Sequence, residues 1–323
     1  MSRGAAHLVE EVHPVAGAAV MGTGIVAVAL FSTGHQGLSD VFLGLALALW
    51  VALAAVVLVR LARDPGGVVH GARAAEALTA VAGTCVIGTR VVLGGSDDAG
   101  ALLLIAGAAL WVVLVVPALR ALPPRAHGGT LLLCVGTEAV AGLAAALAAA
   151  RGASWLLVPA AALAVLGLVL YLDVVRRIDP REPVRGHGDH WVLGGALAIA
   201  ALAFANLHQG ATALGAAPDL HGALRTATIA VAVAAALWLP VLVVSEVAAP
   251  RLRYDARRWA TVFPVGMYAA AASVVGKTEG SGLLRDVAGV LVWVAVAVWA
   301  VVLVGLLGRV GGRVAAGRAS AHG

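Results

Sequence analysis

The chain has few charged residues. Asp, Glu, Lys and Arg make up only 12% of its 323 residues, whereas hydrophobic residues make up 61%. Globular domains in water carry about 25% charged residues, because their surface must be hydrated. This scarcity excludes a water-soluble globular domain and indicates that lipid surrounds most of the protein.

Cysteine is almost absent. Cys85 and Cys134 are the two in the chain, both within apolar stretches, where a free thiol behaves as a small hydrophobe. Neither has a histidine at metal-ligand spacing, so we expect no disulfide, no metal site and no cofactor. Glu10 and Glu11 precede the first apolar stretch, and we therefore expect no cleavable signal peptide.

Long apolar stretches fill nearly all of the chain. Roughly 20 apolar residues cross a hydrocarbon core about 30 Å thick as a helix, and uninterrupted runs do not alternate as barrel strands do. The sequence therefore predicts an all-α integral membrane protein, a single domain over 1–323 with short tails near 1–13 and 310–323. The ten predicted spans lie near 14–31, 38–62, 74–95, 98–121, 129–150, 153–175, 190–213, 222–247, 257–276 and 284–309.

Basic residues gather in every second connection between these spans. Arginine and lysine in short loops resist translocation, so this side, with both termini, is predicted to be cytoplasmic in the cell membrane. The net charge of +5 arises from this bias, and no nucleic-acid partner is implied. The residues are Arg3, Arg60, Arg63, Arg73, Arg120, Arg125, Arg176, Arg177, Arg181, Arg185, Arg251, Arg253, Arg257, Arg258, Arg309, Arg313 and Arg318.

Alternate spans differ in composition. The odd-numbered spans hold more of the glycines and most of the threonines, whereas mid-span tryptophans occur in the even-numbered spans. Glycine permits close backbone approach and threonine supplies a hydroxyl, while large aromatic side chains suit a surface that faces lipid. We therefore expect the odd spans to line an interior and the even spans to surround it.

A Gly-Thr pair recurs in the first, third and fifth spans, at intervals of about 55–60 residues, the length of one helical hairpin. The repeat predicts five hairpins around a central passage, although chance recurrence is an alternative in a chain with 40 glycines. The predicted pore-lining residues are Gly22, Thr23, Gly24, Gly83, Thr84, Gly136, Thr137 and Gly266.

Two motifs resemble signatures of the tellurite-resistance/dicarboxylate transporter family, which includes malate permeases, sulfite efflux pumps and plant guard-cell slow anion channels. One is His13-Pro14 followed by residues 21–26 (Met-Gly-Thr-Gly-Ile-Val); the other is residues 261–268 (Thr-Val-Phe-Pro-Val-Gly-Met-Tyr). The resemblance implies ten helices as five pseudo-symmetric hairpins, a pore lined by the odd helices, commonly a trimer, and a phenylalanine that plugs the pore. One departure is that the third, fifth and seventh spans lack the proline that often kinks pore helices in this family.

Phe263 is the predicted pore gate, beside Pro264. Proline removes a backbone donor and kinks a helix, which would leave a carbonyl free and redirect the phenyl ring. A ring across a narrow apolar passage blocks water and ions. An ordinary packing role is the alternative.

Glu138 is the most unusual residue on energetic grounds. It is predicted about 14 Å deep in the fifth span, where an ionised acid costs several kcal/mol unless it is paired or wetted. Either it binds a proton that is coupled to transport, or it accepts hydrogen bonds from hydroxyls such as that of Thr137 and holds two helices together.

Polar residues near the outer ends of two spans are candidate anion contacts in an outer vestibule. Asn206 and Gln209 share a helix face, with His208 between them, and Arg90 lies close to the outer boundary. The alternatives are helix contact for His208 and headgroup anchoring for Arg90.

Together these features predict a membrane transporter or channel for small anions, with the lipid bilayer and a homotrimer as its partners. The anion stays open among C4-dicarboxylates, sulfite, chloride or nitrate, and tellurite-related oxyanions. A membrane scaffold or sensor subunit is the alternative. An intramembrane enzyme is not expected, because Gly280-Ser281-Gly282 lies in a short loop without a matching histidine.

Overall fold

A computed structural model describes residues 16–181, 190–248 and 258–320. Arg3, His13, Pro14, Arg185, Arg251, Arg253, Arg257 and the predicted tail 1–13 lie outside these ranges. Within them the chain forms helices and no strand. The membrane-length segments are α2 (Ala16–Ser32), α3 (Gln36–Arg63), η1 with α5 (Ala75–Leu93), α6 (Asp97–Arg120), η2 with α7 (Gly128–Arg151), η3 with α8 (Ser154–Val175), α10 (Trp191–Ala213), α11 (Pro218–Ala248), α12 (Trp259–Thr278) and α13 (Gly282–Ser320).

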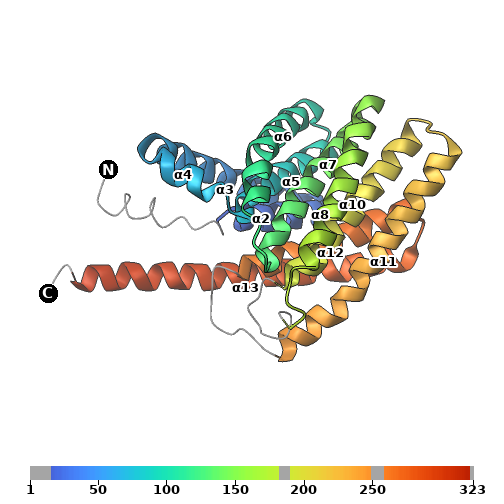
Figure 1. Ribbon diagram of the computed structural model, residues 1–323. Helices are drawn as coiled ribbons and strands as arrows, with labels where there is room; N and C mark the ends of the chain where they lie inside the picture. The colour runs from blue at the N-terminus through green and yellow to red at the C-terminus, as the bar shows by residue number, and fades with distance from the viewer. Residues whose placement is uncertain (1–15, 182–189, 249–257, 321–323) are drawn as a thin grey trace.

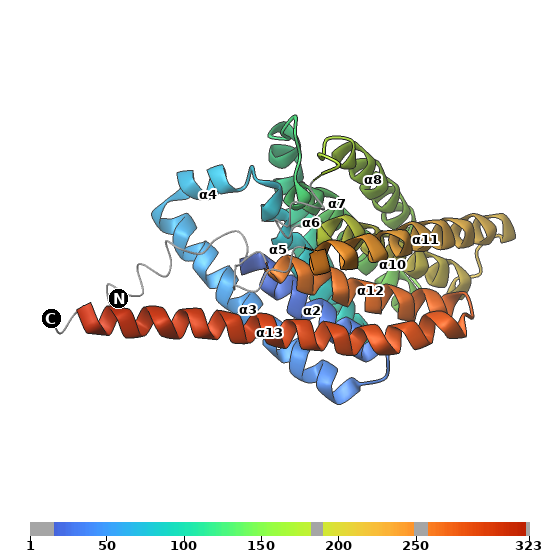
Figure 2. The same cartoon turned by 90° about the horizontal axis from the view of Figure 1, so that it is seen from below.

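These ten segments confirm the predicted fold class. Every described boundary falls within four residues of its prediction except the end of α13, which continues to Ser320 and extends past the other helices in both views of the molecule (Figures 1 and 2). Nine of the described helices are long and apolar enough to cross a membrane, and α2 is a shorter apolar helix. One further short helix, α4 (Pro65–Gly71), follows α3.

The helices form an inner and an outer set. At least two thirds of the spanning residues of α5, α7, α10 and α12 are buried, against 28% or fewer in α3, α6, α8, α11 and α13. Nearly all of α2 is buried as well. The expected division between odd and even spans is therefore confirmed, since the outer helices expose valine and leucine side chains that suit lipid.

The inner helices close into a ring. In order, α2, α5, α7, α10 and α12 each pack against the next, and α12 packs back onto α2. Each outer helix packs most extensively on the inner helix that precedes it in the chain. The protein is thus built from five inner-outer hairpins arranged around one axis.

Each hairpin turns through a glycine with positive φ. These residues are Gly34, Gly95, Gly152, Gly215 and Gly280, with φ between 67° and 91°. A side chain is strained in this left-handed region, whereas glycine is not. The repeated turn places all five hairpin tips at one end of the ring, opposite the end that carries most of the described arginines.

Candidate functional site at the centre of the ring

A small cavity lies on the axis of the ring. The volume that the centre of a water molecule can occupy in this cavity is about 20 Å³. That is enough for about one water. All five inner helices contribute to its lining: Ile25, Val28, Val86, Thr89, Glu138, Ala139, Gly142, Ile199, Leu202, Ala203, Asn206 and Met267. The cavity is therefore the point at which the five hairpins converge.

Its polar lining consists of Thr89, Glu138 and Asn206. Thr89 Oγ1 donates to the carbonyl oxygen of Cys85 at 3.0 Å. Asn206 Nδ2 donates to the carbonyl oxygen of Gly142 at 3.3 Å, which joins α10 to α7. Two residues that sequence reasoning treated as separate candidates, Glu138 and Asn206, thus share one cavity.

Glu138 is buried without a polar partner. The residue is 1% exposed, and neither carboxyl oxygen has a hydrogen-bond partner among the described residues. The end of its side chain packs onto Gly167 of the outer helix α8, where a Cβ would lie 2.4 Å from Oε1. Thr137 does not bond to it, because the Thr137 hydroxyl donates to the carbonyl oxygen of Leu133 instead. The expected hydrogen bonds from Thr137 that would make Glu138 structural are therefore absent.

Phe263 lies one helical turn before Met267 on α12 and is fully buried. Residues four apart share a helix face, and Met267 lines the central cavity. Phe263 is thus on the face of α12 that looks toward the axis. Pro264, next to it, packs against Gly195 of α10.

The three Gly-Thr pairs serve helix packing. Tryptophans of the outer helices donate from Nε1 to the threonine hydroxyls: Trp50 to Thr84 at 2.8 Å, Trp111 to Thr137 at 2.9 Å and Trp299 to Thr23 at 2.9 Å. The expectation that these hydroxyls face a pore is corrected, because each is held by the outer helix of a neighbouring hairpin. The indole N–H groups of these tryptophans point toward the inner helices. The expectation that tryptophans of the even spans only face lipid is therefore corrected as well.

The glycines among the predicted pore-lining residues lie at contacts between inner segments. A Cβ at Gly22 would lie 3.1 Å from Val262, one at Gly83 3.1 Å from Val20, and one at Gly266 2.7 Å from Ile25. A Cβ at Gly24 would lie 3.2 Å from Val86, and one at Gly136 would lie 3.0 Å from Leu78. Their small size lets the ring close tightly.

Arg90 is held at the contact of α2, α3 and α5. Its Nε donates to Ser39 Oγ at 2.5 Å, its Nη2 pairs with Asp40 at 2.5 Å, and its guanidinium lies 4.2 Å from the centre of the Phe31 ring. The structure does not bring Arg90 to the central cavity. It brings together the first two hairpins near their tips.

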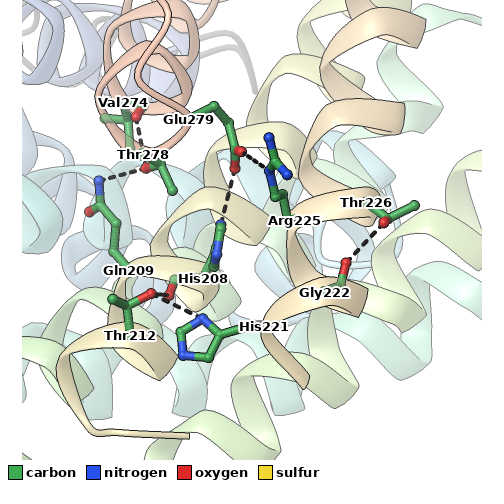
Figure 3. A network of polar contacts seen from close by, with 10 residues as sticks. All are labelled: His208, Gln209, Thr212, His221, Gly222, Arg225, Thr226, Val274, Thr278 and Glu279. Atoms are coloured by element: carbon green, nitrogen blue, oxygen red, sulfur yellow. Dashed lines mark hydrogen bonds and ion pairs between the residues drawn. The ribbon is translucent and has the colours of Figure 1, made fainter. Parts of the chain in front are cut away.

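His208 and Gln209 belong to a polar network at the tips of the last two hairpins (Figure 3). His208 Nδ1 lies 3.0 Å from Glu279 Oε1, Arg225 Nε lies 2.9 Å from Glu279 Oε2, and Gln209 Nε2 donates to Thr278 Oγ1 at 2.8 Å. Sequence reasoning missed Glu279, although an acidic residue directly after an apolar span is a visible signal. His208 and Gln209 thus belong to this network, whereas Asn206 lines the cavity.

Comparisons with known proteins identify related membrane proteins and a family. Two membrane proteins of Mycobacterium tuberculosis, both described as uncharacterized, are 29% identical over 179 residues: one from strain CDC 1551 and one, Rv1735c, from strain H37Rv. Each alignment covers 52% of this chain and 83% of the relative. The model of the SLAC1 family, described as voltage-dependent anion channel, matches residues 11–307. That match spans nearly the whole ring of five hairpins, and the chain therefore belongs to the SLAC1 voltage-dependent anion channel family, as the sequence motifs predicted.

Proposed function

We propose that the protein carries small anions across the membrane along the axis of its five inner helices, through a passage gated by Phe263. The observation that supports this most directly is the cavity to which all five inner helices contribute. Membership of an anion channel family supports the substrate class.

The lining favours an anion that can be released again. Apart from Thr89, Glu138 and Asn206, the cavity residues are apolar or glycine, so no fixed cation is present to trap a negative charge. Weakly hydrated anions lose less hydration free energy on entering such a site than strongly hydrated anions do. Chloride, nitrate, sulfite, C4-dicarboxylates and tellurite-related oxyanions are the candidates, and their weaker hydration ranks chloride and nitrate before the more strongly hydrated dianions.

Closure of the passage is assigned to Phe263. Phe263 is fully buried one helical turn before Met267, which lines the cavity; this spacing supports an axial position for its ring, and apolar constrictions stop ions by excluding water. Since the cavity has room for only about one water, the described conformation fits a closed passage.

Glu138 is the proposed proton-binding group. An ionised carboxylate without a donor or a counter-ion is far costlier to bury than the neutral acid, so the conformation packed on Gly167 fits the protonated form. Ionisation would then favour rotation of the carboxyl group toward the cavity, where water and Asn206 are available. Proton binding at this position would couple anion flux to pH.

Cytoplasmic termini, location in the cell membrane, and a homotrimer remain part of this proposal. A membrane scaffold or sensor subunit without flux is the alternative, and the same experiment separates the two.

The test is anion flux in liposomes reconstituted with the purified protein, comparing chloride, sulfite and malate with and without a pH gradient. Phe263→Ala should raise flux several-fold over the parent protein. Phe42→Ala is the control, because Phe42 is also buried but lies on the outer helix α3. Unchanged or lower flux in a folded Phe263→Ala protein would contradict the gating role of Phe263. No flux in both the parent protein and Phe263→Ala would favour a scaffold or sensor subunit.

A further inference from the structure

Two consecutive glycines of α10, Gly194 and Gly195, contact the part of α12 that contains Phe263, the proposed gate. A Cβ at Gly195 would lie 2.8 Å from both Cβ and Cγ of Pro264 and 3.1 Å from its Cα. A Cβ at Gly194 would lie 2.2 Å from the hydroxyl of Tyr268. Pro264 and Tyr268 are four residues apart and share one face of α12, so the two glycines form one continuous seat for that face.

The contacts at this seat are rigid. The atoms that would meet a Cβ at Gly195 belong to a proline ring and its backbone, which cannot rotate away as a flexible side chain can. Tyr268 is fixed as well, because its hydroxyl donates to the carbonyl oxygen of Ala235 on α11 at 2.7 Å.

The opposite side of α12 is equally close to its neighbour. Gly266 faces Ile25 of α2, where a Cβ would lie 2.7 Å from Cγ2. The turn of α12 from Phe263 to Gly266 is therefore wedged between α10 and α2, and its position depends on glycine at 195 and 266. An added Cβ on either side would lie closer than 3.0 Å to an atom across the contact, so one of the two partners must shift.

We propose that Gly195 is a positioning residue for the gate: its lack of a side chain sets how far Phe263 reaches toward the axis of the ring. Phe263 directly precedes Pro264 in the chain, so a displacement of Pro264 away from α10 carries the Phe263 backbone with it. This inference rests on the proposed function, since it assigns Gly195 a role through Phe263.

The experiment measures chloride flux in liposomes for Gly195→Ala, with and without Phe263→Ala. Gly195→Ala alone should raise flux several-fold, because the displaced turn withdraws the phenyl ring. In the Phe263→Ala background the same change should add nothing, since no ring remains to be moved. An equal rise in both backgrounds would overturn the proposal.

Gly88→Ala is the matched control for crowding within the inner ring. Its Cβ would lie 2.6 Å from Cδ2 of Leu143 and 3.1 Å from Leu103, contacts of similar length that do not involve α12. It should lower the melting temperature and leave flux per folded protein unchanged. A rise in flux as large as that of Gly195→Ala would overturn the specific role of Gly195.

Tyr268→Phe tests the same seat without adding an atom, in case Gly195→Ala does not fold. Loss of the hydrogen bond to Ala235 loosens α12, and a smaller rise in flux that requires Phe263 is expected. No rise in a folded Tyr268→Phe protein, or a rise independent of Phe263, would overturn the proposal. If Phe263→Ala does not raise flux, the proposed gating function of Phe263 is wrong. If Phe263→Ala raises flux but Gly195→Ala and Tyr268→Phe do not, only the proposed role of Gly195 is wrong.

Discussion

The indole nitrogen of Trp299, on the last helix, donates a hydrogen bond of 2.9 Å to the hydroxyl of Thr23 on the first described helix. The same contact joins Trp50 to Thr84 and Trp111 to Thr137. In each case the outer helix of one hairpin bonds to the inner helix of the next, and the Trp299 bond continues this order from the fifth hairpin to the first. The two ends of the ring are thus joined as neighbouring hairpins are.

Loss of this ring-closing bond should destabilise the protein. Trp299→Phe removes the donor and keeps an aromatic ring against Phe42, whose centre lies 4.7 Å away. Hydrogen bonds between membrane helices contribute about 0.6–2 kcal/mol, so the melting temperature in detergent should fall by a few degrees. Trp293→Phe is the control, because Trp293 is 50% exposed. The melting temperature should fall in Trp299→Phe and stay close to that of the parent protein in Trp293→Phe. Adding Thr23→Val to Trp299→Phe should lower it little further, because the hydrogen bond is already lost.

Glu138→Gln should remove the dependence of flux on a pH gradient. Glutamine keeps the size and donor capacity of the protonated acid but cannot release a proton. We expect retained anion flux that no longer responds to pH, measured in liposomes with an imposed gradient. Retained pH dependence would contradict the coupling role, and loss of expression would instead indicate a structural one.

Gly167→Ala should displace the Glu138 side chain from α8. A Cβ at position 167 would lie within 2.7 Å of three atoms of Glu138, and crowding of this kind typically costs about 1–3 kcal/mol. The variant should therefore melt earlier and shift the pH at which flux is half-maximal. Gly289→Ala on α13, with no atom within 4 Å of its Cβ position, should change neither property.

Glu279→Gln should be more destabilising than Arg225→Gln. The Glu279 side chain is 8% exposed and accepts from both His208 and Arg225, whereas Arg225 is 64% exposed. Hydrogen bonds to charged groups contribute about 1.5–3 kcal/mol each; Glu279→Gln removes the charge from two of them, whereas Arg225→Gln removes one and leaves the His208 contact in place. Thermal melting of the two purified variants gives the comparison, and equal losses would show that Glu279 is not the centre of the network.

Much of the fold was predictable from composition. Spans could be located because lipid requires about 20 apolar residues per crossing, and the inner set was predictable because glycine concentrates where helices approach closely, as at Gly83 and Gly266. The turn glycines such as Gly95 and Gly152 were also visible in the sequence, at intervals similar to the Gly-Thr repeat, and would have strengthened the prediction of five hairpins.

The directions of the polar side chains were harder to predict. Thr84 and Thr137 were expected to face a passage, and the structure turns both toward tryptophans of neighbouring hairpins. Arg90 was expected near an outer vestibule, and it pairs with Asp40, fifty residues earlier in the chain. Such partners depend on how hairpins are placed side by side, which no local pattern specifies.

The sequence by itself determined the ten spans, the pairing of each inner helix with the outer helix that follows it, and membership of an anion channel family, because span length, small residues and two motifs are local properties. Only the tertiary structure decided which face of each inner helix looks toward the axis. Positions that face lipid and positions buried between helices are both apolar, so hydrophobic periodicity cannot separate them. The meeting of Glu138, Asn206 and Met267 at one cavity follows from closure of the ring.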